Sequence, residues 1–187
     1  MRKFKSFIAL DLKSNAQNIS IIKKLHNHVY GFKVGYRSFY NKRSNDLISE
    51  IKKKKSKLFL DLKLHDIPNT VSSAIDSLSN INPDFLTLHI SGGSEMIKAA
   101  LNSIKKNKLK TKILGVTLLT SLDGKDSNKL YKERNTKKLV KKYTEIANNE
   151  NIHGLICSGD DLKILAKYKK LIKITPGVKM FARNDDQ

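Results

Sequence analysis

The sequence is poor in residues that many small domains use as rigid supports. Its 187 residues include one cysteine, three prolines and no tryptophan. The single Cys157 cannot form a disulfide within the chain, and no cysteine or histidine spacing is typical of a zinc site. Cys157 also lacks a histidine or asparagine motif that would mark it as a nucleophile, so we expect it to be a packing residue. The chain must therefore rely on an ordinary hydrophobic core. Residues 1–187 are enough to form such a core, and we expect them to form a single domain.

Long hydrophobic runs are also missing. Residues 1–12 hold only a short apolar stretch that Asp11 interrupts, so neither a signal peptide nor a membrane span is expected there. No low-complexity linker divides the chain. The sequence therefore predicts a cytoplasmic protein with no membrane partner.

Acidic residues are scarce beside basic ones. The chain has 17 Asp and Glu against 37 Lys and Arg, which gives a formal net charge of +20. Such a charge suits nucleic acid, an anionic membrane or a phosphorylated substrate. However, only five of the basic residues are arginines, and the lysines are scattered without aromatic interleaving or a nucleic-acid-binding motif. The composition therefore argues against specific nucleic-acid binding, whereas an anionic phosphorylated substrate would still benefit from the positive field.

Apolar residues alternate along the chain between a period of two and a period near 3.6. Strands are expected at residues 7–10, 29–35, 58–64, 85–89, 113–119, 154–158 and 171–175. Amphipathic helices are expected between most of them, whereas the polar residues 123–135 suggest a loop that can move over a site. This alternation is typical of an α/β fold with parallel strands, whose chemistry lies at the carboxyl ends of the strands.

Residues 58–70 carry the densest group of charged residues on an expected strand. Leucine alternates there with polar residues, among them Asp61 and Lys63, so one face of the strand is apolar and the other charged. Pro68 suits the first turn of a helix, and the segment therefore predicts a strand, a short loop and a helix. Spacing alone fits a reactive site and an ordinary surface ion pair equally well.

The sequence of residues 61–70, DLKLHDIPNT, resembles the signature of the orotidine 5′-monophosphate decarboxylases, which complete UMP synthesis. The shorter pattern D-x-K-x-x-D also occurs in related sugar-phosphate aldolases and decarboxylases, whereas the D-I-P-N-T continuation is similar to the nucleotide decarboxylases. Further segments that resemble this family are Ala9-Leu10-Asp11, Lys33-Val34-Gly35, Leu119-Thr120-Ser121 and Pro176-Gly177-Val178-Lys179. The family usually has P-G-I-R at the last of these, so Lys179 stands in place of an arginine.

The resemblance implies a TIM-type (β/α) barrel and covers seven of its eight β/α units. The closing eighth strand and its V-x-G-R phosphate-binding turn have no counterpart in the sequence. We therefore expect the 187 residues alone to be a weak enzyme or none, and an impaired fragment or scaffold of the family is one alternative function. A related sugar-phosphate enzyme that binds magnesium is a second alternative, and a basic nucleic-acid-binding module is the third.

The resemblance also implies a mechanism without a metal or other cofactor. Orotidine 5′-monophosphate loses carbon dioxide from C6, and Lys63 would stabilise the resulting carbanion and then protonate it. Asp61 would lie near the substrate carboxylate. Lys33 and Asp66 would complete an alternating array of charges around Lys63.

The remaining functional residues are also implied by the resemblance. Asp11 would hold a ribose hydroxyl, and Thr120 and Ser121 would lie near the base. Asp66 and Thr70 would reach into the site of a neighbouring subunit, which implies a homodimer with shared active sites. The substrate-binding set is Asp11, Lys33, Asp61, Lys63, Asp66, Ile67, Thr70, Thr120, Ser121, Lys179 and Gln187, the last two at the phosphate.

Overall fold

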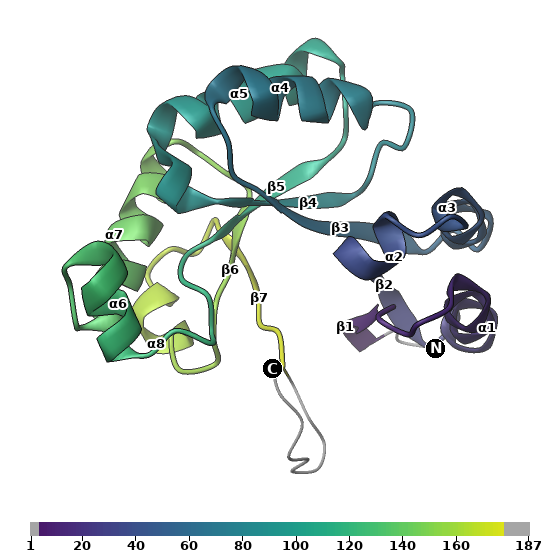
Figure 1. The fold of residues 1–187 in the computed structure, drawn as a ribbon, viewed down its shortest axis with the longest axis horizontal. Coiled ribbons are helices and arrows are strands. Elements are labelled where there is room, and N and C mark those ends of the chain that lie inside the picture. Colours follow the sequence, from purple (N-terminus) through teal and green to yellow (C-terminus); the bar gives the residue numbers. More distant parts are fainter. Residues whose placement is uncertain (1–3, 178–187) are drawn as a thin grey trace.

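The computed structural model describes residues 4–177, which form a curled parallel sheet with helices on its outer side (Figure 1). The elements in chain order are β1 (Phe4–Ala9), α1 (Asn15–Leu25), β2 (Val29–Gly35), α2 (Tyr36–Phe39), α3 (Ser44–Lys53), β3 (Lys57–Leu64), α4 (Pro68–Ser77), β4 (Phe85–His89), the 3-10 helix η1 (Ile90–Gly92), α5 (Gly93–Lys106), β5 (Lys112–Val116), α6 (Gly124–Tyr131), α7 (Thr136–Asn149), β6 (Gly154–Ile156), α8 (Leu162–Leu165) and β7 (Ile172–Ile174).

The seven strands of this region lie in the sheet in the same order as in the chain, from β1 to β7. Each neighbouring pair is parallel. Helices follow the strands and cover the convex face of the sheet, with α1 and α3 at one end, α4 and α5 in the middle and α7 at the other end (Figure 1). Within residues 4–177 the sheet is open between β1 and β7. The predicted TIM-type barrel with seven strands is confirmed.

Two hydrophobic clusters lie on the two faces of the sheet. The larger one fills the space between strands and helices and includes Leu58, Leu60 and Leu62 of β3. The smaller one lies on the inner face and mixes aliphatic with aromatic side chains, among which Phe59 and Phe85 pack edge to face with Phe7 at centroid distances of 5.3 and 5.5 Å. Side chains two positions apart share a face of a strand. The smaller cluster therefore forms a floor beneath the inward-facing residues that follow Phe59.

Strands 29–35 and 85–89 begin and end where the sequence predicts them. The predicted strand 113–119 was too long, because β5 ends at Val116 and Thr117 turns its hydroxyl to the carbonyl of Ile156 at 3.3 Å. β6 likewise ends at Ile156, before the predicted residue 158. Cys157 is buried in the larger cluster, as expected of a packing residue, and burial raises the pKa of its thiol to about 11.

Two helices were not predicted. Residues 36–39 form the short α2 directly after β2. Residues 124–131, which we expected to be a mobile loop, form α6, because the Asp123 carboxylate accepts hydrogen bonds from the amides of Lys125 and Asp126 and so caps the helix. Within residues 4–177 no helix is long and apolar enough to cross a membrane.

Candidate active site

The site begins with an irregularity in β3. Leu60 pairs with Leu86, but the next pair is Leu64 with Leu88, so β3 advances four residues while β4 advances two. Lys63 lies within this bulge and has a φ of 42°, in the left-handed region that residues other than glycine rarely occupy. Strained backbone of this kind clusters at functional sites.

Four charged side chains form a row of alternating sign at the carboxyl ends of β1, β2 and β3. Lys63 Nζ lies 2.9 Å from both carboxylate oxygens of Asp61. Lys33 Nζ lies 3.4 Å from Asp61 Oδ2 and 3.7 Å from Asp11 Oδ2. Asp61, between the two lysines, has the least exposed side chain of the four, at 14%. The structure thus brings together three of the predicted catalytic residues and adds Asp11.

The charge of Asp61 is set by competing effects. Burial raises the pKa of this carboxyl, but the hydrogen bond and charge of Lys63, the charge of Lys33 and a hydrogen bond from Thr87 together hold it below its ordinary value. Asp61 is therefore an anion at neutral pH. An ammonium group held on a buried carboxylate is a fixed positive charge that can meet an anion in the space above it.

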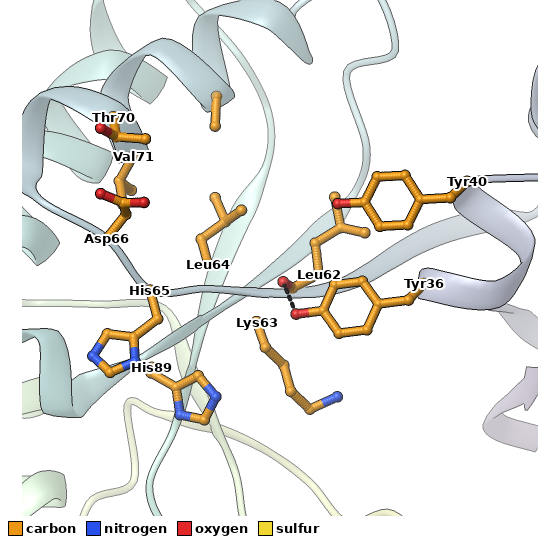
Figure 2. Close-up of a pocket in the computed structure, with 11 residues that line it drawn as sticks. Tyr36, Tyr40, Leu62, Lys63, Leu64, His65, Asp66, Thr70, Val71 and His89 are labelled. Carbon is orange, nitrogen blue, oxygen red and sulfur yellow. Dashed lines mark hydrogen bonds between the residues drawn. The ribbon is translucent and has the colours of Figure 1, made fainter.

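Two residues that contact this bulge, Thr87 and Tyr36, had no predicted role. The Thr87 hydroxyl donates to Asp61 Oδ1 at 3.0 Å and accepts from the Lys63 amide at 2.8 Å. The Tyr36 hydroxyl donates to the carbonyl of Leu62 at 2.6 Å, as the dashed line in Figure 2 shows. A lone hydroxyl within the apolar run 85–89 is the signal that could have identified Thr87, because a buried polar group needs a partner.

A cavity of about 430 Å³ opens beside Lys63. Two histidines line it with their ring centroids 5.2 Å apart, His65 after β3 and His89 at the end of β4 (Figure 2). The pKa of His89 is lowered mainly by burial and, to a smaller extent, by the positive charges of the nearby His65 and Lys63. His89 is therefore neutral at pH 7.

Asp66 and Thr70 line the same cavity but lie on the far side of His65 from the Lys63 ammonium (Figure 2). The carboxylate of Asp66 accepts from the amide of Ile67 at 2.7 Å, and among residues 4–177 it forms no ion pair. Ile67 itself is 65% exposed. Within one chain, then, Asp66, Ile67 and Thr70 stand apart from the charged row.

The other predicted binding residues lie further along the chain. Thr120 and Ser121 are exposed in the turn after β5, and they do not line the cavity. Lys179 and Gln187 lie outside the described residues. In the part of the chain that the structure covers, no three His, Cys, Asp or Glu side chains are grouped so that they could hold a metal ion.

Comparison with known proteins assigns this arrangement to a family. A model of the family described as "Orotidine 5'-phosphate decarboxylase / HUMPS family" matches residues 5–187. The chain belongs to this family. A relative from Wolbachia sp. subsp. Brugia malayi, named orotidine 5′-phosphate decarboxylase, is 36% identical over 183 residues, which make up 96% of this chain and 79% of the relative. A relative of the same name from Lawsonia intracellularis is 37% identical, with 98% of this chain and 81% of the relative covered.

The fold agrees with a solved member of the family. The crystal structure of orotidine 5′-phosphate decarboxylase from Lactobacillus acidophilus matches with a TM-score of 0.80 and 32% sequence identity, over 94% of this chain and 81% of that one. The charged row of this family member therefore lies on the β/α barrel that the motif in residues 61–70 predicted.

Proposed function

We propose that the chain is a carboxy-lyase that converts orotidine 5′-monophosphate to UMP and carbon dioxide, with Lys63 as the reacting acid. The observation that carries the proposal is the Lys63 ammonium, which lies 2.9 Å from both oxygens of Asp61 at the carboxyl end of a barrel strand. Family membership and the names of the relatives support the same reaction. The activity belongs to pyrimidine synthesis, in which UMP is the product.

The reaction needs a fixed positive charge. The bond between C6 and the carboxylate breaks, carbon dioxide leaves, and the electron pair stays on C6. The Lys63 ammonium stabilises this pair and then gives its proton to C6, after which the amine regains a proton from solvent. The backbone bulge and the contact with Asp61 hold Lys63 before the substrate arrives, so little reorganisation is required.

Asp61 has two roles in this proposal. Its charge keeps the ammonium oriented, and its position near the substrate carboxylate makes the loss of that carboxylate favourable. Lys33 lies 3.4 Å from Asp61. Once Lys63 has given up its proton and its charge, the ammonium of Lys33 still balances the negative charge of the Asp61 carboxylate. Asp11, 3.7 Å from Lys33, extends the row toward the sugar, where its carboxylate would accept from a ribose hydroxyl.

The proposal includes a homodimer with shared active sites. Asp66 and Thr70 lie on the far side of His65 from the Lys63 ammonium of their own chain (Figure 2). Two large side chains are strongly exposed, Tyr40 at 76% on another side of the same cavity and Ile67 at 65% next to Asp66. A second copy would cover these side chains, and its own Lys63 would then receive the carboxylate of Asp66. Thr120 and Ser121 would contact the base, and Lys179 and Gln187 the phosphate. The cytoplasmic location stays a prediction.

The test is turnover of orotidine 5′-monophosphate by the wild-type chain and by Lys63→Ala. We expect Lys63→Ala to lose at least about a thousandfold in kcat, because its contribution lies in the transition state, while its affinity for UMP changes by about threefold or less. The 187-residue chain is assayed beside a version extended by the C-terminal segment of a relative, since the matched region makes up 79% of the Wolbachia relative. The matched control is Lys98→Ala, which removes an exposed lysine that pairs with Glu95 on α5.

Two results would contradict the proposal. Near-normal turnover by Lys63→Ala would show that Lys63 is not the reacting acid. No turnover by either wild-type polypeptide, in an assay that would detect a reaction a thousandfold slower than that of an active enzyme, would show that the chain lacks the proposed activity.

A further inference from the structure

The peptide unit between Leu62 and Lys63 lies in the bulge of β3, and both of its polar groups bond to side chains. The Leu62 carbonyl accepts from the Tyr36 hydroxyl at 2.6 Å, and the Lys63 amide donates to Thr87 Oγ1 at 2.8 Å. A regular strand would bond these groups to the backbone of its neighbours. At this point, hydrogen bonds to side chains from α2 and β4 therefore take the place of the backbone hydrogen bonds between strands.

Thr87 is the more constrained of these two partners. It is fully buried in the middle of β4, whereas Tyr36 is 48% exposed. Its hydroxyl accepts from the Lys63 amide and donates to Asp61 Oδ1 at 3.0 Å, so one oxygen atom joins the backbone of Lys63 to the side chain of Asp61. A threonine hydroxyl has one proton to donate, and here the Asp61 carboxylate takes it.

We infer that Thr87 is a positioning residue for the proposed decarboxylation, which holds the Lys63 backbone in its left-handed conformation and holds the Asp61 carboxylate against the Lys63 ammonium. The inference rests on the roles proposed for Asp61 and Lys63. Thr87 does not touch the substrate in this account. It acts by keeping the strained bulge and the ion pair in one arrangement before the substrate binds.

The consequence for Asp61 follows from its surroundings. The charged or titratable groups around it are Lys63 on β3, Lys33 on β2, Tyr36 on α2 and His89 on β4, with Asp11 after β1 on the other side of Lys33. Thr87 is an uncharged donor among them. Removal of its hydroxyl leaves the charges in place but takes one hydrogen bond from the carboxylate, so the pKa of Asp61 rises.

The experiment compares Thr87→Val, which has nearly the same shape but no hydroxyl, with Thr87→Ser, which keeps the hydroxyl. We expect Thr87→Val to lose about ten- to a hundredfold in kcat, the range for one hydrogen bond to a charged group, with KM changed by about twofold or less. Thr87→Ser should restore most of kcat. The acid limb of the pH–kcat profile should move to higher pH in Thr87→Val and not in Thr87→Ser.

A second readout does not depend on turnover. The titration of the Asp61 carboxyl, followed by carbon-13 NMR and assigned with Asp61→Asn, should move to higher pH in Thr87→Val. If Thr87→Val does not fold, Thr87→Cys takes its place, because a thiol is a much weaker donor and acceptor than a hydroxyl. This measurement separates the two proposals: the absence of turnover in both the 187-residue and the extended wild-type polypeptides contradicts the proposed function, whereas an unchanged Asp61 titration in Thr87→Val contradicts the role of Thr87.

The matched control is Thr111→Val. Thr111 is also buried, at 2% exposure, and its hydroxyl donates to the carbonyl of Pro83 at 2.6 Å, at the opposite end of the strands from Asp61. It should lose stability but keep kcat and the Asp61 titration. An equal fall in kcat for Thr111→Val, no rescue by Thr87→Ser, or wild-type kcat and Asp61 titration in Thr87→Val would each overturn the inference.

Discussion

At the scale of single residues, His153 is a buried titratable group that contacts the sheet, so we expect the stability of the fold to depend on its protonation. Its Nδ1 accepts a hydrogen bond from the amide of Ile113 at 3.1 Å, at the start of β5. An accepting nitrogen carries no proton, so the ring is neutral in the folded chain. Burial, and then the charge of Lys112, lower the pKa of His153.

We therefore expect the protein to lose stability in mild acid. Unfolded histidine titrates near pH 6.5. Because the folded pKa of His153 is lower, the unfolded state binds more protons as the pH falls below about 6.5, and the free energy of unfolding decreases. The melting temperature should fall by about a few degrees between pH 7 and 5.5.

The variant His153→Gln, which keeps an acceptor without a titrating group, should show a smaller fall. His28→Gln, an exposed position, is the control and should behave as wild type. Equal falls in all three proteins would show that His153 does not contribute.

At the scale of elements, a buried polar network ties α1 and α2 to the loop that carries Asp11. The side-chain amide of Asn18 donates to Ser38 Oγ at 3.0 Å, and its oxygen accepts from the amide of Leu12 at 3.3 Å. The Ser38 hydroxyl in turn donates to the carbonyl of Leu10. The backbone on both sides of Asp11 is thus held by side chains from the two helices.

The substitution Asn18→Leu should destabilise the fold by about 1–3 kcal/mol, because it removes the hydrogen bond to the buried hydroxyl of Ser38 and leaves the amide of Leu12 without its side-chain acceptor. Urea unfolding measures this loss. Gln17→Leu, at an exposed position one residue earlier in α1, is the control and should change the free energy of unfolding by about 0.5 kcal/mol or less. Equal stability of Asn18→Leu and wild type would show that the network does not stabilise the loop.

At the scale of the whole molecule, the proposed homodimer with shared active sites predicts complementation. Lys63→Ala and Asp66→Asn should each be inactive alone, because each lacks one essential charge in every site. After subunit exchange, a mixed dimer contains one site with both residues intact. The mixture should therefore recover up to about a quarter of wild-type activity, since half of the dimers are mixed and one of their two sites works.

The control for this experiment is a mixture of Lys63→Ala with the double variant Lys63→Ala, Asp66→Asn, which cannot form an intact site. No recovery by the first mixture, once exchange between two stable dimers has been demonstrated, would place Asp66 outside the neighbouring site.

Much of the fold was determined by local sequence. The strands 29–35 and 85–89 follow from their apolar pattern, and the start of α4 follows from Pro68. Asp61 and Lys63 were identified as a pair because they share one face of a strand and belong to a family motif. Each of these features depends on residues that are neighbours in the chain, so the spacing of apolar residues and the residue types at turns are enough to predict it.

Only the tertiary structure showed what holds that pair. Thr87 lies 26 residues from Asp61 and meets it because β3 bulges against β4. Tyr36 reaches Leu62 from a helix that the sequence did not predict. Side-chain contacts across strands depend on register, and the two extra residues that β3 has relative to β4 shift the register of everything after them. The pattern of β3 does not record that shift, since leucine and polar residues alternate through the bulge without a break.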